Sequence, residues 1–166
     1  MVLEGTMEYD NESFQLEYHD TDDFSELEIS QCKQVYAVYF ISEEQILLVY
    51  NGKKRHWGLP GGTIELGESL EASLNREILE ESNTQVVAMK PVGYQKVTDS
   101  AGRYFYQLRC VCIVRPLGTF SADPAGDIHE LLIIKPQEYR RYFDWGEIGE
   151  YIMLRATELY STLILN

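Results

Sequence analysis

Cysteines and long apolar runs are both scarce in this chain of 166 residues, and their scarcity excludes several classes of protein. Its three cysteines, Cys32, Cys110 and Cys112, cannot all pair, and neither a C-x-x-C motif nor a Cys/His zinc spacing is present. We therefore expect a reducing, cytoplasmic environment. No apolar run approaches the roughly 18 residues that span a bilayer. The N-terminus has no basic segment followed by an apolar one, so we expect neither export nor membrane insertion.

Positive charge is also scarce. The chain has 14 lysines and arginines against 27 aspartates and glutamates, which gives a net charge of −13. Such a balance disfavours direct binding to a nucleic-acid backbone. A free nucleotide remains compatible with it, because a bound metal ion can supply the missing positive charge.

The length and the 45% hydrophobic content predict a single domain over residues 1–166. Residues 1–32 are acidic and partly alternating, which predicts an extra N-terminal strand or hairpin. Two apolar runs, at 35–41 and 45–50, predict a buried hairpin. Further strands are predicted at 85–89, 92–97, 104–114 and 131–134, with helices beginning at about Gln137 and spanning about 145–163.

The strand at 104–114 alternates in a way that assigns its residues to two faces. Phe105, Gln107, Arg109, Val111 and Ile113 share one face, and both faces carry enough apolar surface to predict a central strand covered on two sides. Cys110 and Cys112 are accordingly interpreted as core thiols and not as a redox pair.

A glycine loop that runs into an acidic helix, residues 62–84, is the feature around which the chain is organised. Leu70, Leu74 and Ile78 recur every four residues and form one apolar stripe of the predicted helix. The helix would therefore face a core with this stripe.

Three glutamates lie on a neighbouring face of this helix. Glu77 precedes Glu80 and Glu81 by three and four residues, which sets their Cβ atoms roughly 5–6 Å apart. Carboxylates this close repel unless a cation joins them, and Mg²⁺ uses carboxylates together with substrate phosphates. The spacing suggests a metal platform, and the alternative is a solvated acidic face of a surface helix.

Neighbouring residues favour the metal platform. Gly61 and Gly62 allow the backbone to approach a ligand or the helix closely. Glu68 stands at the start of the helix, and Arg76 can hold Glu80, four residues further on, by a charge-assisted hydrogen bond.

Gly62, Glu68 and the run Arg76-Glu77-Ile78-Leu79-Glu80-Glu81 together resemble the signature box of the Nudix hydrolases. The box usually ends in a glycine and a bulky aliphatic residue, and this chain has Asn83 and Thr84 there. Asparagine is the usual substitute for glycine at a left-handed helix cap, so we expect the helix end to be kept.

The resemblance covers roughly residues 33–160 and implies an α/β/α sandwich with a mixed central sheet. It also implies an Mg²⁺- or Mn²⁺-dependent hydrolase that cleaves a diphosphate linkage in a nucleoside di- or triphosphate derivative. Glu77, Glu80 and Glu81 would be the metal ligands and catalytic residues, one of them doubling as base, with Glu68 and Arg76 in support. Features of the family's ADP-ribose and NADH enzymes are absent, and Tyr104 stands slightly late for the tyrosine of its diadenosine-polyphosphate enzymes. A nucleoside triphosphate is left as the default substrate.

Residues outside the box complete the predicted site. Gly61, Gly62, Lys53 and Arg55 are candidate substrate-binding residues, although a solvated turn explains the two basic ones equally well. Glu130, which ends a loop rich in proline and glycine, is the candidate fourth catalytic carboxylate. Asp127 is its competitor, and a solvated loop acid is the alternative for either.

Two other functions stay open at this point. A Nudix-like nucleotide-binding or regulatory module would keep the fold without turnover, and a structural domain would merely present an acidic helix. As partners we expect a small-molecule substrate and neither nucleic acid nor membrane, with a homodimer as an open alternative.

Overall fold

The computed structural model describes residues 1–121 and 123–164. Within them the strands form one mixed sheet in the order β1-β2-β7-β8-β3-β4-β5, with β6 paired to β3 and β9 paired to β4. Only β3 and β8 run parallel among the described pairs. The strands are β1 (Val2–Tyr9), β2 (Glu12–Asp20), β3 (Cys32–Ser42), β4 (Gln45–Asn51), β5 (His56–Gly58), β6 (Gly61–Thr63), β7 (Thr84–Thr98), β8 (Tyr104–Pro116) and β9 (Ile128–Ile134).

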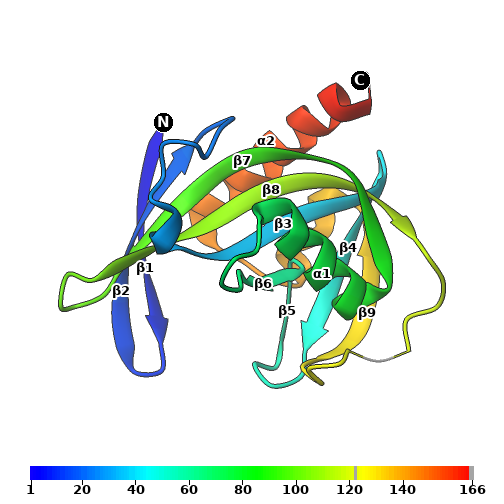
Figure 1. The fold of residues 1–166 in the computed structure, drawn as a ribbon, viewed down its shortest axis with the longest axis horizontal. Helices are drawn as coiled ribbons and strands as arrows, with labels where there is room; N and C mark the ends of the chain where they lie inside the picture. The colour runs from blue at the N-terminus through cyan, green and yellow to red at the C-terminus, as the bar shows by residue number, and fades with distance from the viewer. Residues whose placement is uncertain (122, 165–166) are drawn as a thin grey trace.

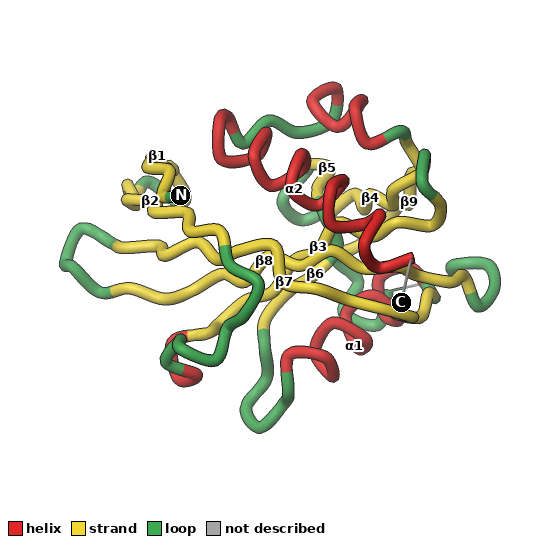
Figure 2. The backbone as a smooth tube through the Cα atoms, turned by 90° about the horizontal axis from the view of Figure 1, so that it is seen from above, coloured by secondary structure: helices red, strands yellow, loops and turns green. Residues whose placement is uncertain are grey.

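Two helices cover opposite faces of the sheet, as Figure 2 shows: α1 (Leu70–Ser82) and α2 (Gly146–Ile164). Each helix closes a separate core. One core joins Leu74 and Ile78 of α1 to alternate residues of β3 and β8, and the other joins Ile152 of α2 to the opposite set. This arrangement confirms the predicted α/β/α sandwich with a mixed sheet.

The helix α1 has the ends that its sequence predicts. Ser69 caps it by accepting a hydrogen bond from the Ala72 N–H over 3.1 Å. At the other end Asn83 takes a left-handed conformation with φ 53°, and its N–H donates to the Leu79 carbonyl. The expected asparagine cap is thereby confirmed.

The N-terminal residues form a hairpin of β1 and β2, which extends the sheet beyond β7 and lies at the left of Figure 1. Contacts to α2 hold this hairpin in place. The Tyr151 hydroxyl donates to Asp20 over 3.2 Å, and Arg155 pairs with Asp20 and with Asp22. The hairpin is therefore fastened to both the sheet and the second helix.

Two local predictions were wrong. The strands predicted at 85–89 and 92–97 are one long strand, β7, because a shift of register between Pro91 and Gly93 lets Pro91 sit in the sheet without donating a ladder hydrogen bond. The helix predicted from Gln137 is only a short 3-10 helix, Pro136–Arg141. No helix in the described ranges has both the length and the apolar character needed to cross a membrane.

Candidate active site

A cavity of about 920 Å³ opens between the N-terminal hairpin, the sheet, α1 and the start of α2. The acidic face of α1 and the glycines of β6 form one wall, while side chains of β3, β7 and β8 form another. A cavity of this size holds a nucleotide-sized ligand.

Glu77, Glu80 and Glu81 all line this cavity, and the glycines of β6 lie directly against them. The Gly61 N–H donates to Glu81 Oε2 over 3.0 Å. A Cβ added to Gly62 would stand 2.7 Å from Glu77 Oε1 and 2.8 Å from its Oε2. Glycine is therefore required at 62 for the Glu77 carboxylate to keep its place.

Arg76 braces this carboxylate wall. Its guanidinium donates to both oxygens of Glu68, over 2.8 and 2.9 Å, and to Glu77 Oε1 over 2.8 Å. Its distance to Glu80 Oε2 is 3.6 Å. The expected contact with Glu80 is thus present, but the closer bonds are to Glu68 and Glu77.

The environment of these carboxylates favours protons or cations. Burial raises the pKa of Glu81 to about 9; the bond from Gly61 opposes this, and Glu77, Asp123 and Glu80 add to the rise. Burial also raises the pKa of Glu77, although Arg76 works against it. By contrast, the bonds from Arg76 lower the pKa of Glu68. Burial therefore outweighs the single contact of Glu77 with Arg76, no cation is among the causes that set the pKa of Glu81, and Glu68 is matched by Arg76 on both of its oxygens.

The donor set suits a hard divalent cation, because all three box side chains offer carboxylate oxygens to the same cavity. In the described part of the chain, no three His, Cys, Asp or Glu side chains stand in an arrangement that could hold an ion as they are. Arg76 and the Gly61 N–H already engage oxygens of Glu77 and Glu81. Glu77, Glu80 and Glu81 are the residues of this wall whose carboxylates could hold a metal.

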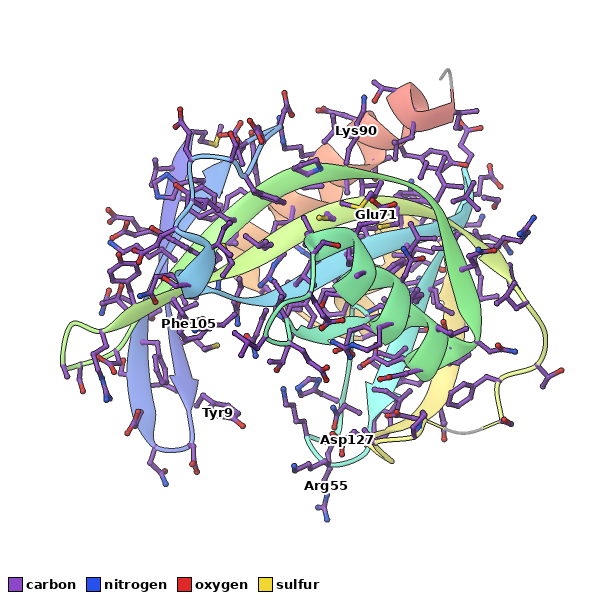
Figure 3. The ribbon with its side chains drawn as sticks, viewed as in Figure 1. Tyr9, Arg55, Glu71, Lys90, Phe105 and Asp127 are labelled. Carbon is purple, nitrogen blue, oxygen red and sulfur yellow. The ribbon has the colours of Figure 1, made fainter. Side chains whose placement is uncertain are left out.

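The candidate basic residues before the box lie at the tip of the β4–β5 turn. Lys53 and Arg55 are exposed, and Figure 3 shows the Arg55 side chain extending away from the ribbon. Neither is among the residues that line the cavity, whereas Lys54 is. All three basic residues of the turn are exposed, and the sequence alone did not reveal which of them borders the cavity.

Glu130 is exposed on β9, opposite Tyr50 of β4, and is not among the cavity residues. Its competitor Asp127 does line the cavity. Figure 3 shows Asp127 at the same end of the molecule as Arg55, and the Asp127 carbonyl accepts a bond from the Gly52 N–H over 2.8 Å. Of the two loop acids weighed, the structure thus brings Asp127 to the site and leaves Glu130 outside it.

Asp123 and Arg109 are among the cavity residues that were not predicted. Asp123 is buried, lines the cavity and anchors the loop by accepting bonds from the N–H groups of Ala125, Asp127 and Ile128. Arg109 lines the sheet wall and is only 5% exposed. A signal for Arg109 was available, since Gln107 and Arg109 stand two residues apart on an otherwise apolar strand face.

The fold and the cavity together define a class of α/β/α protein. In this class an acidic helix that follows a glycine loop faces a cavity large enough for a ligand. Residues 32–155 match the family model of the NUDIX domain. The chain therefore belongs to the Nudix family.

Three similar proteins illustrate the range of the family. A Bacillus subtilis protein provisionally named 8-oxo-dGTP diphosphatase is 37% identical over 62 residues, which are 37% of this chain and 42% of that protein. The chain thus matches less than half the length of this relative. The crystal structure of a mutant of the pyrophosphohydrolase BsRppH of Bacillus subtilis superposes with a TM-score of 0.70 at 17% identity, covering 96% of this chain and 99% of that one. The NUDIX domain of NrtR from Shewanella oneidensis, solved with ADP ribose, gives a TM-score of 0.60 at 17% identity, covering 82% and 95%.

Proposed function

We propose that the protein is an Mg²⁺- or Mn²⁺-dependent hydrolase that cleaves a diphosphate linkage in a nucleoside di- or triphosphate derivative. The observation that carries this proposal is the wall of Glu77, Glu80 and Glu81 in one cavity. The pyrophosphohydrolase and the diphosphatase among its relatives support the same reaction class.

In the reaction, a water oxygen bonds to phosphorus and the bond from that phosphorus to the bridging oxygen breaks. The water loses a proton to a base, and the bridging oxygen leaves with its phosphate. A bound metal would polarise the phosphoryl oxygens and gather the charge that develops on them. We assign Glu77, Glu80 and Glu81 to holding it, and one of the three to accepting the proton of the water.

The supporting residues have narrower parts. Arg76 and Glu68 keep the helix face and the loop before it together, so we assign them to positioning. Gly62 packs closely against the Glu77 carboxylate. This supports a role for the two glycines in allowing the loop backbone to approach both the carboxylate and a ligand. The β4–β5 turn supplies Lys54 to the cavity. For Lys53, Arg55 or Glu130 to have a role, the side chain would have to move toward the cavity or the substrate would have to extend out of it.

The test is the release of phosphate or pyrophosphate from a panel of nucleoside triphosphates and diphosphate-linked nucleotides, with Mg²⁺, with Mn²⁺ and with a chelator. Hydrolysis that needs the metal and stops with the chelator is expected. Full activity after exhaustive chelation would contradict the metal assignment. Nucleotide binding without any product under all conditions would instead favour a binding or regulatory module.

Location and assembly are separate proposals. Cys32, Cys110 and Cys112 are all free thiols, which supports a reducing cytoplasm. Light scattering on the purified protein would decide between a monomer and a homodimer.

A further inference from the structure

The cavity has a second charged group, away from the carboxylate wall, to which no role is yet assigned. Arg109 lies on β8 beneath the cavity and is 5% exposed, and no acidic side chain of the described residues forms an ion pair with it. Its Nε is buried and has no hydrogen-bond partner among them. A buried cation without a counter-charge destabilises a fold by several kcal/mol in general. Its presence in the wall of a cavity therefore points to a ligand.

Three glutamines stand in a row beside this guanidinium, on adjacent strands. Gln34 of β3 and Gln95 of β7 are each paired in register with Gln107 of β8. Gln107 Oε1 accepts a bond from Arg109 Nη2 over 2.9 Å and one from Gln95 Nε2 over 3.3 Å. Gln107 Nε2 then donates to Gln34 Oε1 over 2.6 Å.

Arg109 fixes the orientation of all three amides, because a guanidinium can only donate. The Gln107 oxygen must face Arg109. The Gln107 nitrogen therefore faces Gln34 and donates a hydrogen bond to the Gln34 oxygen. For the same reason Gln95 must turn its nitrogen toward the Gln107 oxygen. A ligand can therefore accept hydrogen bonds from N–H groups of Gln34 and Arg109. It can donate one to the side-chain oxygen of Gln95.

Two aromatic rings flank the guanidinium. Its Cζ lies 5.1 Å from the centroid of Tyr36 and 5.6 Å from that of Trp145, just before α2. Tyr36 is paired in register with Gly61, whose N–H bonds Glu81, so this residue links the guanidinium to the carboxylate wall. Aromatic rings and amides suit a planar heterocycle, whereas phosphates belong near the carboxylates that would hold the metal.

We propose that Arg109, Gln34 and Gln95 form a base-reading subsite that selects guanine, with Arg109 donating to O6 and N7 and Gln95 accepting from N1–H. Guanine is the base that presents two adjacent acceptors to one arginine, whereas adenine presents a donor beside its N7. This inference rests on the proposed function for its nucleotide, but the recognition itself needs no hydrolysis.

Hydrolysis of GTP, ATP, CTP and UTP tests the subsite in the metal-loaded protein. The wild type should have a higher kcat/KM for GTP than for ATP by roughly tenfold or more, the discrimination typical of one bidentate contact. Arg109→Met should remove this preference by raising KM for GTP toward the value for ATP. Arg115→Met is the matched control, because Arg115 lies on the same strand, exposed and bonded to Gln85. Equal loss of kcat for all four nucleotides would overturn the proposal and assign Arg109 to the phosphates.

Comparing the hydrolysis of dGTP with that of 8-oxo-dGTP tests the contact with N7 directly. The oxidised base carries a proton on N7, which would face the donor-only guanidinium. The wild type should therefore prefer dGTP, and Arg109→Met should narrow the gap. A preference for 8-oxo-dGTP would overturn the N7 contact.

Calorimetric titration with GMP, AMP and pyrophosphate in a chelator separates the subsite from the reaction. GMP should bind more tightly than AMP, and Gln95→Met should weaken GMP binding without a change of charge; a melting curve first establishes that each variant is folded. Selective GMP binding by a protein that hydrolyses none of the nucleotides would contradict the proposed function and support the subsite. Nucleotide hydrolysis by a protein that binds GMP and AMP equally would support the proposed function and contradict the subsite.

Discussion

Arg76 and Arg109 line two walls of one cavity and differ in what surrounds them. Arg76 is held by Glu68 and Glu77 within 2.9 Å, with Glu80 at 3.6 Å. Arg109 is more deeply buried and has a glutamine oxygen, a backbone carbonyl and two aromatic rings as neighbours.

The difference separates a positioning role from a binding one. The charge of Arg76 is matched inside the protein, so its bonds stabilise the fold and orient the carboxylates. No acidic side chain among the described residues pairs with Arg109, so the fold bears the cost of burying its charge. The following changes would sharpen or break this contrast.

The largest effect is expected at the acidic wall that Arg76 supports. Glu81→Gln and Glu80→Gln keep size and polarity but remove ligand charge, so each should lower kcat by ~10²-fold, about 2.7 kcal/mol of barrier. Steady-state kinetics at saturating Mg²⁺ measures it. Glu71→Gln, exposed on the same helix, is the control and should leave kcat unchanged. Near-normal kcat with an unchanged metal dependence would remove that glutamate from the metal site.

Arg76→Met should destabilise the protein by about 2 kcal/mol, because it leaves Glu68 and Glu77 without their charge-assisted bonds. Urea denaturation measures the free energy of unfolding. Arg103→Met removes an ion pair of an exposed arginine and should cost less than about 1 kcal/mol. If the two variants lost the same stability, Arg76 would not be a brace.

Gly62→Ala tests how closely the wall is built. The added Cβ would meet the Glu77 carboxylate at 2.7 Å and displace it, so kcat should fall by about tenfold, ~1.4 kcal/mol of barrier. Gly58→Ala is the control, since the nearest side-chain atom to its Cβ is 4.0 Å away. An unaffected Gly62→Ala enzyme would show that Glu77 can shift without consequence.

Arg109→Met should keep or raise the free energy of unfolding, by about 1 kcal/mol, because an apolar side chain of similar length replaces an unmatched buried charge. The same urea titration measures it, beside Arg76→Met. A loss of more than about 2 kcal/mol would make Arg109 a structural residue like Arg76 and break the comparison.

The smallest effect concerns acid stability. Because bonds from Arg76 lower the pKa of Glu68 in the folded state, the stability from this pair is present above the unfolded pKa and is lost as pH falls through the folded one. Between about pH 5 and pH 3, Glu68→Gln should therefore lose less stability than the wild type. Glu44→Gln, in the exposed β3–β4 turn, should follow the wild type. Parallel curves for all three proteins would contradict the pairing.

The sequence by itself determined the features that depend on near neighbours in the chain. The spacing of Leu74, Ile78 and the box glutamates determined which side of α1 is buried and which is acidic, since helical geometry relates residues three and four apart. Asn83 likewise predicted its own left-handed cap. These features need only a few adjacent residues, so local patterns suffice.

Only the tertiary structure decided which distant residues meet. Gln34, Gln95 and Arg109 come together through the register of β3, β7 and β8, and a shift of one residue would turn their side chains to the other face. The path of the loop before β9 likewise brought Asp123 and Asp127, and not Glu130, to the cavity. Strand register and loop path are set by packing across the whole sheet, which no local pattern encodes.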